Sequence, residues 1–256
     1  MGAPMPIFDL QGQIALVTGG SKGIGFGMAS ALVRAGAKVA IAGRSAADGA
    51  EAARQLGELG GEACFFQADV TNKAQVQRMV DMVVAHFGKI DILLNNAGMN
   101  IRKPLLEVEE NDWEAVMATN LKGVFLVGQS VAKQMAAQKS GSIINVSSIL
   151  GGVAMPNQTS YAASKGGVNQ LTKVWAAELA HLNIKVNAIA PAYIRTPMTE
   201  KWLEDPFRYS EIVNSTLMGR VGDVTELDGP AVFLASSASS YMTGHILYVD
   251  GGWLAK

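Results

Sequence analysis

The chain has 256 residues, of which 49% are hydrophobic and 17% are charged, and its formal net charge at pH 7 is -1. A chain this close to neutral lacks the basic surface that nucleic acid or an anionic membrane requires, so both classes of partner are excluded. Cys64 is the single cysteine and cannot close a disulfide within the chain, so nothing requires an oxidising compartment. We therefore expect a cytoplasmic protein whose partners are small molecules and other protein subunits.

Neither a targeting segment nor a metal site is expected. Residues 1–10 lack the basic and apolar regions of a secretory signal, and Pro6 stands where a myristoylation motif requires Ser or Thr. Apolar runs elsewhere end within about ten residues, short of the ~20 that a membrane helix needs. His86, His181 and His245 have no carboxylate or cysteine at ligand spacing, and we predict no metal.

Short apolar runs alternate along the chain with longer segments of helical periodicity, which is typical of βαβ units. The runs predict strands at residues 14–17, 38–42, 63–67, 90–95, 142–147, 185–189 and 246–249. The segments between them predict helices at residues 25–35, 48–59, 74–87, 112–137, 161–180 and 225–235. The expected fold is α/β: a single Rossmann-type domain over residues 1–256, with a doubly wound sheet of seven parallel strands and helices on both faces.

The segment of residues 191–218 interrupts this alternation and contains Pro191, Pro197 and Pro206. In an open parallel sheet, ligands bind beyond the carboxyl ends of the strands, and this segment directly follows the sixth predicted strand. We therefore predict that residues 191–218 form a lid insertion over the substrate.

A glycine-rich turn, "TGGSKGIG", follows the first predicted strand and opens the first helix. Gly19, Gly23 and Gly25 allow a tight turn and a close approach of the backbone to a pyrophosphate. Free amides at the start of a helix then bind the anion. An ordinary glycine-rich loop is the alternative, but the position between a strand and a helix favours a dinucleotide site.

Further motifs follow this turn in order: "ADV" at residues 68–70, "NNAG" at 95–98, "NVSS" at 145–148 and "YAASK" at 161–165. Together they resemble the short-chain dehydrogenase/reductase family, and the resemblance extends from Leu10 to "VDGGW" at 249–253. It implies an NAD(P)-dependent oxidoreductase that interconverts a ketone and a secondary alcohol. It also implies a homotetramer.

Tyr161 and Lys165 are four residues apart in a predicted helix and therefore share one face. A free tyrosine has a pKa near ~10, and a neighbouring ammonium stabilises the phenolate, so we expect Lys165 to draw the pKa of Tyr161 toward the working range. Tyr161 is then the general acid in reduction and the base in oxidation. An amphipathic helix with one surface lysine is the alternative.

The resemblance adds two catalytic residues. It implies that Ser148, at the end of the fifth strand, hydrogen-bonds the substrate oxygen, and that Asn120 supports a water relay to the lysine. Ser147 cannot share the first role because successive strand side chains point to opposite faces. For Asn120 the alternative is a helix asparagine that satisfies a local backbone group.

The residues after the second strand, "AGRS", set the expected cofactor preference. Gly43 stands where an acid would bind the ribose hydroxyls of NAD(H), whereas Arg44 and Lys22 can bind a 2′-phosphate, so we predict NADP(H), with NAD(H) as the alternative. The resemblance adds adenine contacts, strand-end residues and nicotinamide contacts. The full predicted cofactor set is Gly19, Ser21, Lys22, Gly23, Ile24, Gly25, Arg44, Asp69, Val70, Asn96, Ala97, Gly98, Tyr161, Lys165, Pro191, Ile194 and Thr196. Ala192 departs from the family, which usually has glycine there.

The substrate is less well defined. Arg102, beyond "NNAG", either pairs with a substrate carboxylate or is a solvated loop residue. "GMNIRKP" and "VDGGWLAK" resemble the gluconate 5-dehydrogenase and deoxygluconate dehydrogenase branches of the family. The 3-oxoacyl reductases share most of the same motifs. The aromatic residues of the predicted lid, Trp202, Phe207 and Tyr209, would equally suit a general ketone. The predicted substrate contacts are Arg102, Ser148, Tyr161 and Trp202. A non-catalytic dinucleotide sensor is a further alternative, which the intact Ser148, Tyr161 and Lys165 argue against.

Overall fold

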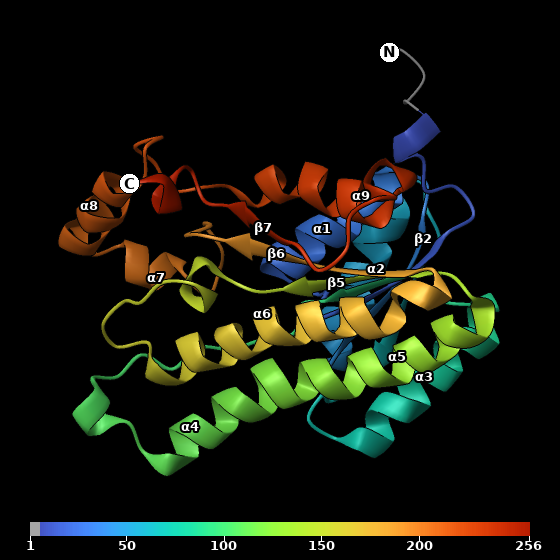
Figure 1. Cartoon of the computed structure of the whole chain (residues 1–256), viewed down its shortest axis with the longest axis horizontal. Helices are drawn as coiled ribbons and strands as arrows, with labels where there is room; N and C mark the ends of the chain where they lie inside the picture. The colour runs from blue at the N-terminus through green and yellow to red at the C-terminus, as the bar shows by residue number, and fades with distance from the viewer. Residues whose placement is uncertain (1–5) are drawn as a thin grey trace.

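Seven parallel strands form one sheet in the order β3-β2-β1-β4-β5-β6-β7 (Figure 1). The computed structural model describes residues 6–256, so the sequence predictions that concern residues 1–5 lie outside the described part. The strands are β1 (Ile14–Thr18), β2 (Lys38–Gly43), β3 (Ala63–Gln67), β4 (Ile92–Asn95), β5 (Gly141–Val146), β6 (Ile184–Pro191) and β7 (Ile246–Val249). The predicted doubly wound parallel sheet is confirmed.

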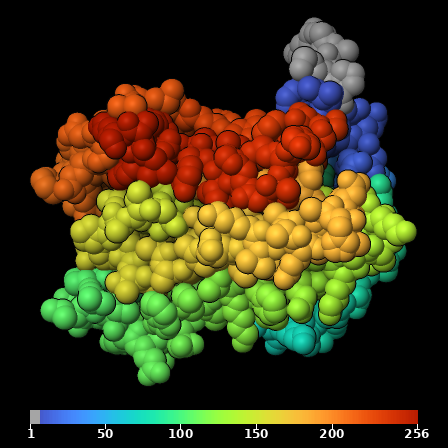
Figure 2. Space-filling model, viewed as in Figure 1, coloured from blue at the N-terminus to red at the C-terminus, as the bar shows by residue number. Residues whose placement is uncertain are grey.

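Helices cover both faces of the sheet, as the sequence predicts (Figure 1). Their bounds are α1 (Gly23–Arg34), α2 (Ala46–Glu58), α3 (Lys73–Phe87), α4 (Glu110–Met117), α5 (Val124–Gln138), α6 (Thr159–Leu179), α7 (Glu200–Leu203), α8 (Pro206–Ser215) and α9 (Asp228–Ala235). Helix α1 packs against α9 on one face, and α3, α5 and α6 cover the other. Figure 2 shows α6 crossing the front of the molecule between α5 and the C-terminal segment.

Several predicted elements differ in detail from the structure; the sixth strand, for example, extends to Pro191 rather than to residue 189. The predicted helix at residues 112–137 is interrupted by a π-helical turn, Ala118–Gly123, between α4 and α5. Apolar periodicity cannot detect one turn of i→i+5 bonding, because the side-chain pattern continues on both sides of it. The fourth strand begins at Ile92 rather than at residue 90, and a 3₁₀ turn, Val224–Leu227, precedes α9.

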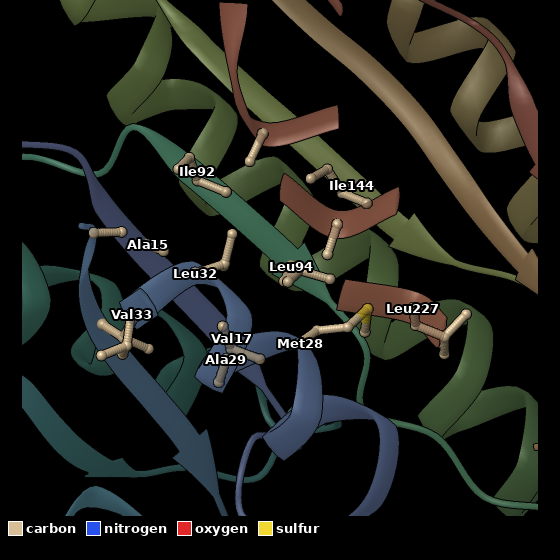
Figure 3. Packing of buried hydrophobic residues seen from close by; sticks show 14 of the residues in the cluster. Ala15, Val17, Met28, Ala29, Leu32, Val33, Ile92, Leu94, Ile144 and Leu227 are labelled. Carbon is tan, nitrogen blue, oxygen red and sulfur yellow. The ribbon is translucent and has the colours of Figure 1, made fainter. Parts of the chain in front are cut away.

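Two apolar layers hold the sheet between the helices, and β4 contributes to both. Ile92 and Leu94 pack with Met28 and Leu32 of α1, whereas Leu93 belongs to the layer under α3 and α5 (Figure 3). Alternate strand residues therefore serve opposite faces, and both faces are apolar because helices cover both. This explains the continuous apolar runs that identify the strands in the sequence.

The carboxyl ends of the strands gather the functional segments. The strand order reverses between β1 and β4, where a doubly wound sheet opens a crevice for a ligand. The segment that follows β6 contains α7 and α8, which lie together at one end of the molecule (Figure 1). It has a small apolar cluster of its own, formed by Tyr193, Leu203, Ile212 and Val221.

Two further observations apply to residues 6–256. None of the helices is long and apolar enough to cross a membrane. No three His, Cys, Asp or Glu side chains gather closely enough to hold a metal ion.

We expect Leu94→Ala to lower the free energy of unfolding by about 2–5 kcal/mol, because it leaves a cavity between β4 and α1. Leu94 is fully buried. Urea unfolding followed by tryptophan fluorescence measures the change. Leu106→Ala is the control, since Leu106 is 96% exposed and should change stability by less than about 0.5 kcal/mol. Equal effects of the two variants would contradict this account of the core.

Candidate active site

The glycine-rich turn between β1 and α1 has the backbone shape that a close-bound anion requires. Gly19 and Gly23 adopt positive φ angles of 64° and 56°. A Cβ atom on Gly25 would lie 2.3 Å from the carbonyl oxygen of Gly19, so no side chain fits there. Lys22 precedes α1 without a side-chain cap, which leaves amides of the first turn free for a ligand. The turn therefore fits a pyrophosphate.

The loop after β4 is tied to this turn. The Thr18 hydroxyl oxygen accepts hydrogen bonds from the backbone amides of Asn96 (3.0 Å) and Ala97 (3.1 Å). The Asn96 side-chain amide donates in turn to the carbonyl oxygens of Thr18 (3.0 Å) and Gly19 (3.2 Å). These bonds fix the floor of a cavity of about 560 Å³, which Asn96, Ala97 and Gly98 line.

Ser148, Tyr161 and Lys165 line the same cavity. Tyr161 and Lys165 are one turn apart on α6, and the Lys165 Nζ atom lies 5.6 Å from the centre of the Tyr161 ring. Lys165 is only 4% exposed, and its Nζ atom donates a 2.7 Å hydrogen bond to the carbonyl oxygen of Val146. The three predicted groups thus meet at the carboxyl end of β5.

Ser147 and Ser148 have different surroundings, although both line the cavity. The Ser147 hydroxyl donates a 2.6 Å hydrogen bond to Asn169 Oδ1 on α6. The Ser148 hydroxyl oxygen accepts from the amide of Leu150 at 3.2 Å, and the hydroxyl lies within hydrogen-bonding reach of the Tyr161 phenol, with its own proton available to donate. Ser148 is therefore the serine whose hydroxyl can donate to a substrate.

Burial controls the ionisation of the tyrosine and the lysine. Desolvation raises the pKa of Tyr161 above its ordinary value, while the Ser148 hydroxyl and the Arg102 charge lower it by less. Desolvation also lowers the pKa of Lys165 to about 8. The net shift of the Tyr161 pKa is thus upward, because loss of water around the phenol outweighs the groups that lower it, and Lys165 is not among those groups.

Asn120 lies in the π-helical turn and is fully buried. Its side chain makes two hydrogen bonds to the backbone of Met99: Oδ1 accepts from the amide at 2.8 Å, and Nδ2 donates to the carbonyl oxygen at 2.8 Å. Nδ2 also donates to the Ser164 hydroxyl on α6. A Cβ atom on Gly98 would lie 3.4 Å from Asn120 Oδ1 and 3.8 Å from Lys165 Nζ, so the asparagine and the lysine approach one place.

The end of the cavity where the sequence predicts the adenosine of the cofactor, called the adenosine end below, is lined by Ser21, Lys22, Gly43, Arg44 and Asp48. The predicted adenine contacts, Asp69 and Val70, do not line it. The Asp69 carboxylate accepts hydrogen bonds from the Thr71 amide and hydroxyl. Val70 packs against Gly123, where an added Cβ atom would lie 2.8 Å from Val70 Cγ2. In this structure both residues shape the strand end rather than the cavity wall.

The segment after β6 forms the opposite wall, where Pro191, Ile194 and Thr196 line the cavity with the glycine-rich turn. A Cβ on Gly23 would lie 3.6 Å from Thr196 Cβ, so the two segments nearly touch. Ala192 is not among the residues with positive φ, and its amide donates to the Val249 carbonyl oxygen. Alanine therefore fits this position without strain.

Arg102 lines the cavity at the end where the sequence predicts the substrate. Its guanidinium carbon lies 5.0 Å from the centre of the Trp202 ring, and Trp202 stacks on Tyr193 at 5.3 Å with 9° between the planes. Trp202 itself does not line the cavity, and its predicted contact with substrate stays a prediction; its ring packs against the Arg102 guanidinium. The Arg102 Nε atom is buried without a protein partner among residues 6–256.

The comparisons with known proteins agree with this geometry. Residues 19–254 match the family model described as enoyl-(acyl carrier protein) reductase. The 2-dehydro-3-deoxy-D-gluconate 5-dehydrogenase of Escherichia coli (strain K12) is 44% identical, over 97% of this chain and 98% of its own. The chain belongs to the short-chain dehydrogenase/reductase family. It is therefore an NAD(P)-dependent oxidoreductase that interconverts a ketone and a secondary alcohol.

Relatives with two kinds of substrate in their names resemble this short-chain dehydrogenase. The 3-oxoacyl-(acyl-carrier-protein) reductase of Thermotoga maritima is 43% identical, over 95% of this chain and 98% of its own. A gluconate 5-dehydrogenase from Burkholderia cenocepacia, solved in complex with NADP and tartrate, is 41% identical with a TM-score of 0.95, over 98% of each chain.

Some site residues of this short-chain dehydrogenase were missed by sequence reasoning. Asn100 Nδ2 donates a 2.9 Å hydrogen bond to Gln158 Oε1, which joins the Arg102 loop to the start of α6, three residues before Tyr161. Both amides line the cavity, as does Tyr193. Asn100 stands in the quoted "GMNIRKP" segment, but no spacing rule pairs it with a residue 58 positions away.

The buried lysine predicts a pH dependence of stability. An unfolded lysine has a pKa near ~10.4, and the folded pKa of Lys165 is about 8, so between these values the unfolded state binds more protons. Stability therefore rises with pH from about pH 8 to 10. Lys165→Met should reduce this rise in the free energy of unfolding by roughly 2 kcal/mol. Burial also lowers the pKa of Lys185 to about 8, and its contribution to the rise is the same in both proteins.

Urea unfolding of the wild type and Lys165→Met at several pH values, without cofactor, measures this difference. Groups common to both proteins cancel in the comparison. Parallel stability curves from pH 8 to 10 would show that Lys165 keeps an ordinary pKa and that its burial costs nothing.

Proposed function

We propose that this chain is an NADP(H)-dependent dehydrogenase that interconverts a hydroxyl and a ketone on a sugar acid. One observation carries the substrate assignment: the Arg102 guanidinium lines the same cavity as Ser148 and Tyr161. Its charge is close enough to affect the pKa of the Tyr161 phenol. A substrate that carries both a carboxylate and a carbonyl can therefore engage Arg102 and Tyr161 together.

The cofactor assignment rests on charge at the adenosine end. Lys22 and Arg44 line this end, and β2 ends at Gly43 with Arg44 next, so no acid at the strand end can bind the ribose of NAD(H). The crystal structure of the Burkholderia relative contains NADP, which supports the same choice. When bound, the nicotinamide supplies or accepts the hydride. NAD(H) remains the weaker alternative because its ribose carries no phosphate for these cations.

The chain's own residues handle the proton and the substrate oxygen. The Ser148 hydroxyl donates a hydrogen bond to the carbonyl oxygen, and Tyr161 delivers its proton to that oxygen as negative charge develops during reduction. A raised pKa keeps Tyr161 protonated at neutral pH, as an acid must be. The Lys165 ammonium stabilises the phenolate that remains, and Asn120 holds the Met99 backbone beside the lysine.

A 3-oxoacyl thioester reductase is the second candidate, which the Thermotoga relative supports. The two candidates differ in what meets Arg102. A thioester has no carboxylate, so burying the arginine against its acyl chain would leave a cation without a partner. A general ketone lacks a carboxylate as well, and Phe207, an aromatic residue of the predicted lid segment, is 71% exposed and does not line the cavity.

We further propose a cytoplasmic homotetramer that uses the long helices as contacts and the segment of residues 191–218 as a lid. Phe125 of α5 is 39% exposed and Val174 of α6 is 48% exposed, and both helices lie on the face shown in Figure 2. Apolar side chains exposed on neighbouring helices favour a subunit interface. Sedimentation of the purified protein tests the assembly.

Tyr161→Phe separates a catalyst from a dinucleotide sensor. We expect turnover of a keto sugar acid with NADPH to fall by about 10³-fold, because the phenol proton is lost. The affinity for NADPH, followed by fluorescence without substrate, should change less than twofold. Unchanged turnover would remove Tyr161 from the mechanism, and a wild type that binds NADPH but turns over no ketone or alcohol would favour the sensor.

Arg102→Leu tests the substrate class. We expect kcat/KM for a keto sugar acid to fall by about 100-fold, the value of one buried charge-assisted bond, while the corresponding methyl ester is affected less than about threefold. Arg208→Leu is the matched control, since Arg208 also lies over Trp202, at 5.6 Å, but does not line the cavity. Equal losses for acid and ester would exclude Arg102 as the carboxylate contact.

A further inference from the structure

We propose that Asp48 sets the balance between NADP(H) and NAD(H), by competing with the 2′-phosphate of NADP(H) for Lys22 inside the cofactor cavity. The inference rests on the proposed cofactor assignment and concerns a residue to which neither the sequence motifs nor the comparisons give a role. It predicts that this chain binds NADP(H) less tightly than its two cations allow.

The geometry brings the carboxylate to the cation. Asp48 lies in the first turn of α2, where its backbone amide donates to the capping Ser45 hydroxyl. Its Oδ2 atom is 2.8 Å from the Nζ atom of Lys22, on the glycine-rich turn. The ion pair bridges two segments that approach closely, because a Cβ on Gly43 would lie 3.5 Å from the Ser21 hydroxyl. All five residues line the same cavity.

The Asp48 carboxylate offsets one of the two cations at this end before a ligand arrives. Hydrogen bonding to Lys22 holds the pKa of Asp48 below its usual value, so the carboxylate is ionised at neutral pH. Arg44 has no carboxylate within 4.0 Å among residues 6–256, although the Asp69 charge acts on it from further away. Of the two cations, Arg44 is therefore available to a phosphate, while Lys22 is already neutralised.

A 2′-phosphate carries about two negative charges at neutral pH. It must either share Lys22 with the carboxylate or displace it, and in both cases it lies beside a like charge. The 2′-hydroxyl of NAD(H) is neutral and avoids this repulsion. It can instead donate a hydrogen bond to the Asp48 carboxylate, the role that an acid after the second strand has in NAD-binding sheets. Asp48 therefore weakens the binding of NADP(H) and leaves the binding of NAD(H) unopposed.

Asp48→Asn tests the proposal by direct binding. We expect the ratio of NADPH affinity to NADH affinity to rise by about five- to tenfold, since an exposed ion pair is worth up to about fivefold and the phosphate carries roughly twice the charge. Tryptophan fluorescence or calorimetry, without substrate, measures both dissociation constants. The rise should shrink at high ionic strength, because salt screens exposed charges.

Glu51→Gln is the matched control. Glu51 lies on the same helix and is paired with Arg54, its removal changes the net charge equally, and it does not line the cavity. An unchanged ratio in Asp48→Asn, a fall in NADPH affinity, or the same rise in Glu51→Gln would each overturn the proposal. A wild type that binds neither cofactor would instead overturn the proposed function.

Discussion

The buried ammonium of Lys165 is the constraint on which the site depends. An ammonium on a residue that is only 4% exposed needs a compensating environment, and here its Nζ atom donates a 2.7 Å hydrogen bond to the carbonyl oxygen of Val146. That oxygen belongs to the last residue of β5, so the lysine can sit there only if α6 packs over the end of the strand. The same packing brings Tyr161 and Ser148 to one cavity. The packing of α6 on β5 therefore determines where the groups of the proposed active site lie.

The rest of the cavity is built from strand ends that the fold brings to one edge. The glycine-rich turn follows β1, the adenosine end follows β2, and the Asn96 loop follows β4. Side chains of the loops hold one another through Thr18, Asn96 and Asn120 rather than through the ligand. Preorganised groups of this kind need little rearrangement when charge develops. The substrate end is different, because Arg102 depends on stacking against Trp202 in the segment of residues 191–218.

Much of this arrangement could be predicted from the sequence, since it follows from local rules. Apolar runs identify the seven strands because both sheet faces are buried. Other features depend on contacts between distant residues. The π-helical turn at Asn120 has no periodic signal, and the direction of the Tyr161 pKa follows from burial that spacing does not reveal. The contact of Trp202 with Arg102 likewise requires the folded segment of residues 191–218.

The most direct measurement is a crystal structure of the protein with NADP and a hydroxy sugar acid bound. The account predicts that one substrate oxygen lies about 2.6–3.2 Å from both the Tyr161 and the Ser148 hydroxyl oxygens, with the carboxylate on Arg102. A sugar acid that binds with every oxygen away from Tyr161, although the dinucleotide occupies the glycine-rich turn, would contradict it.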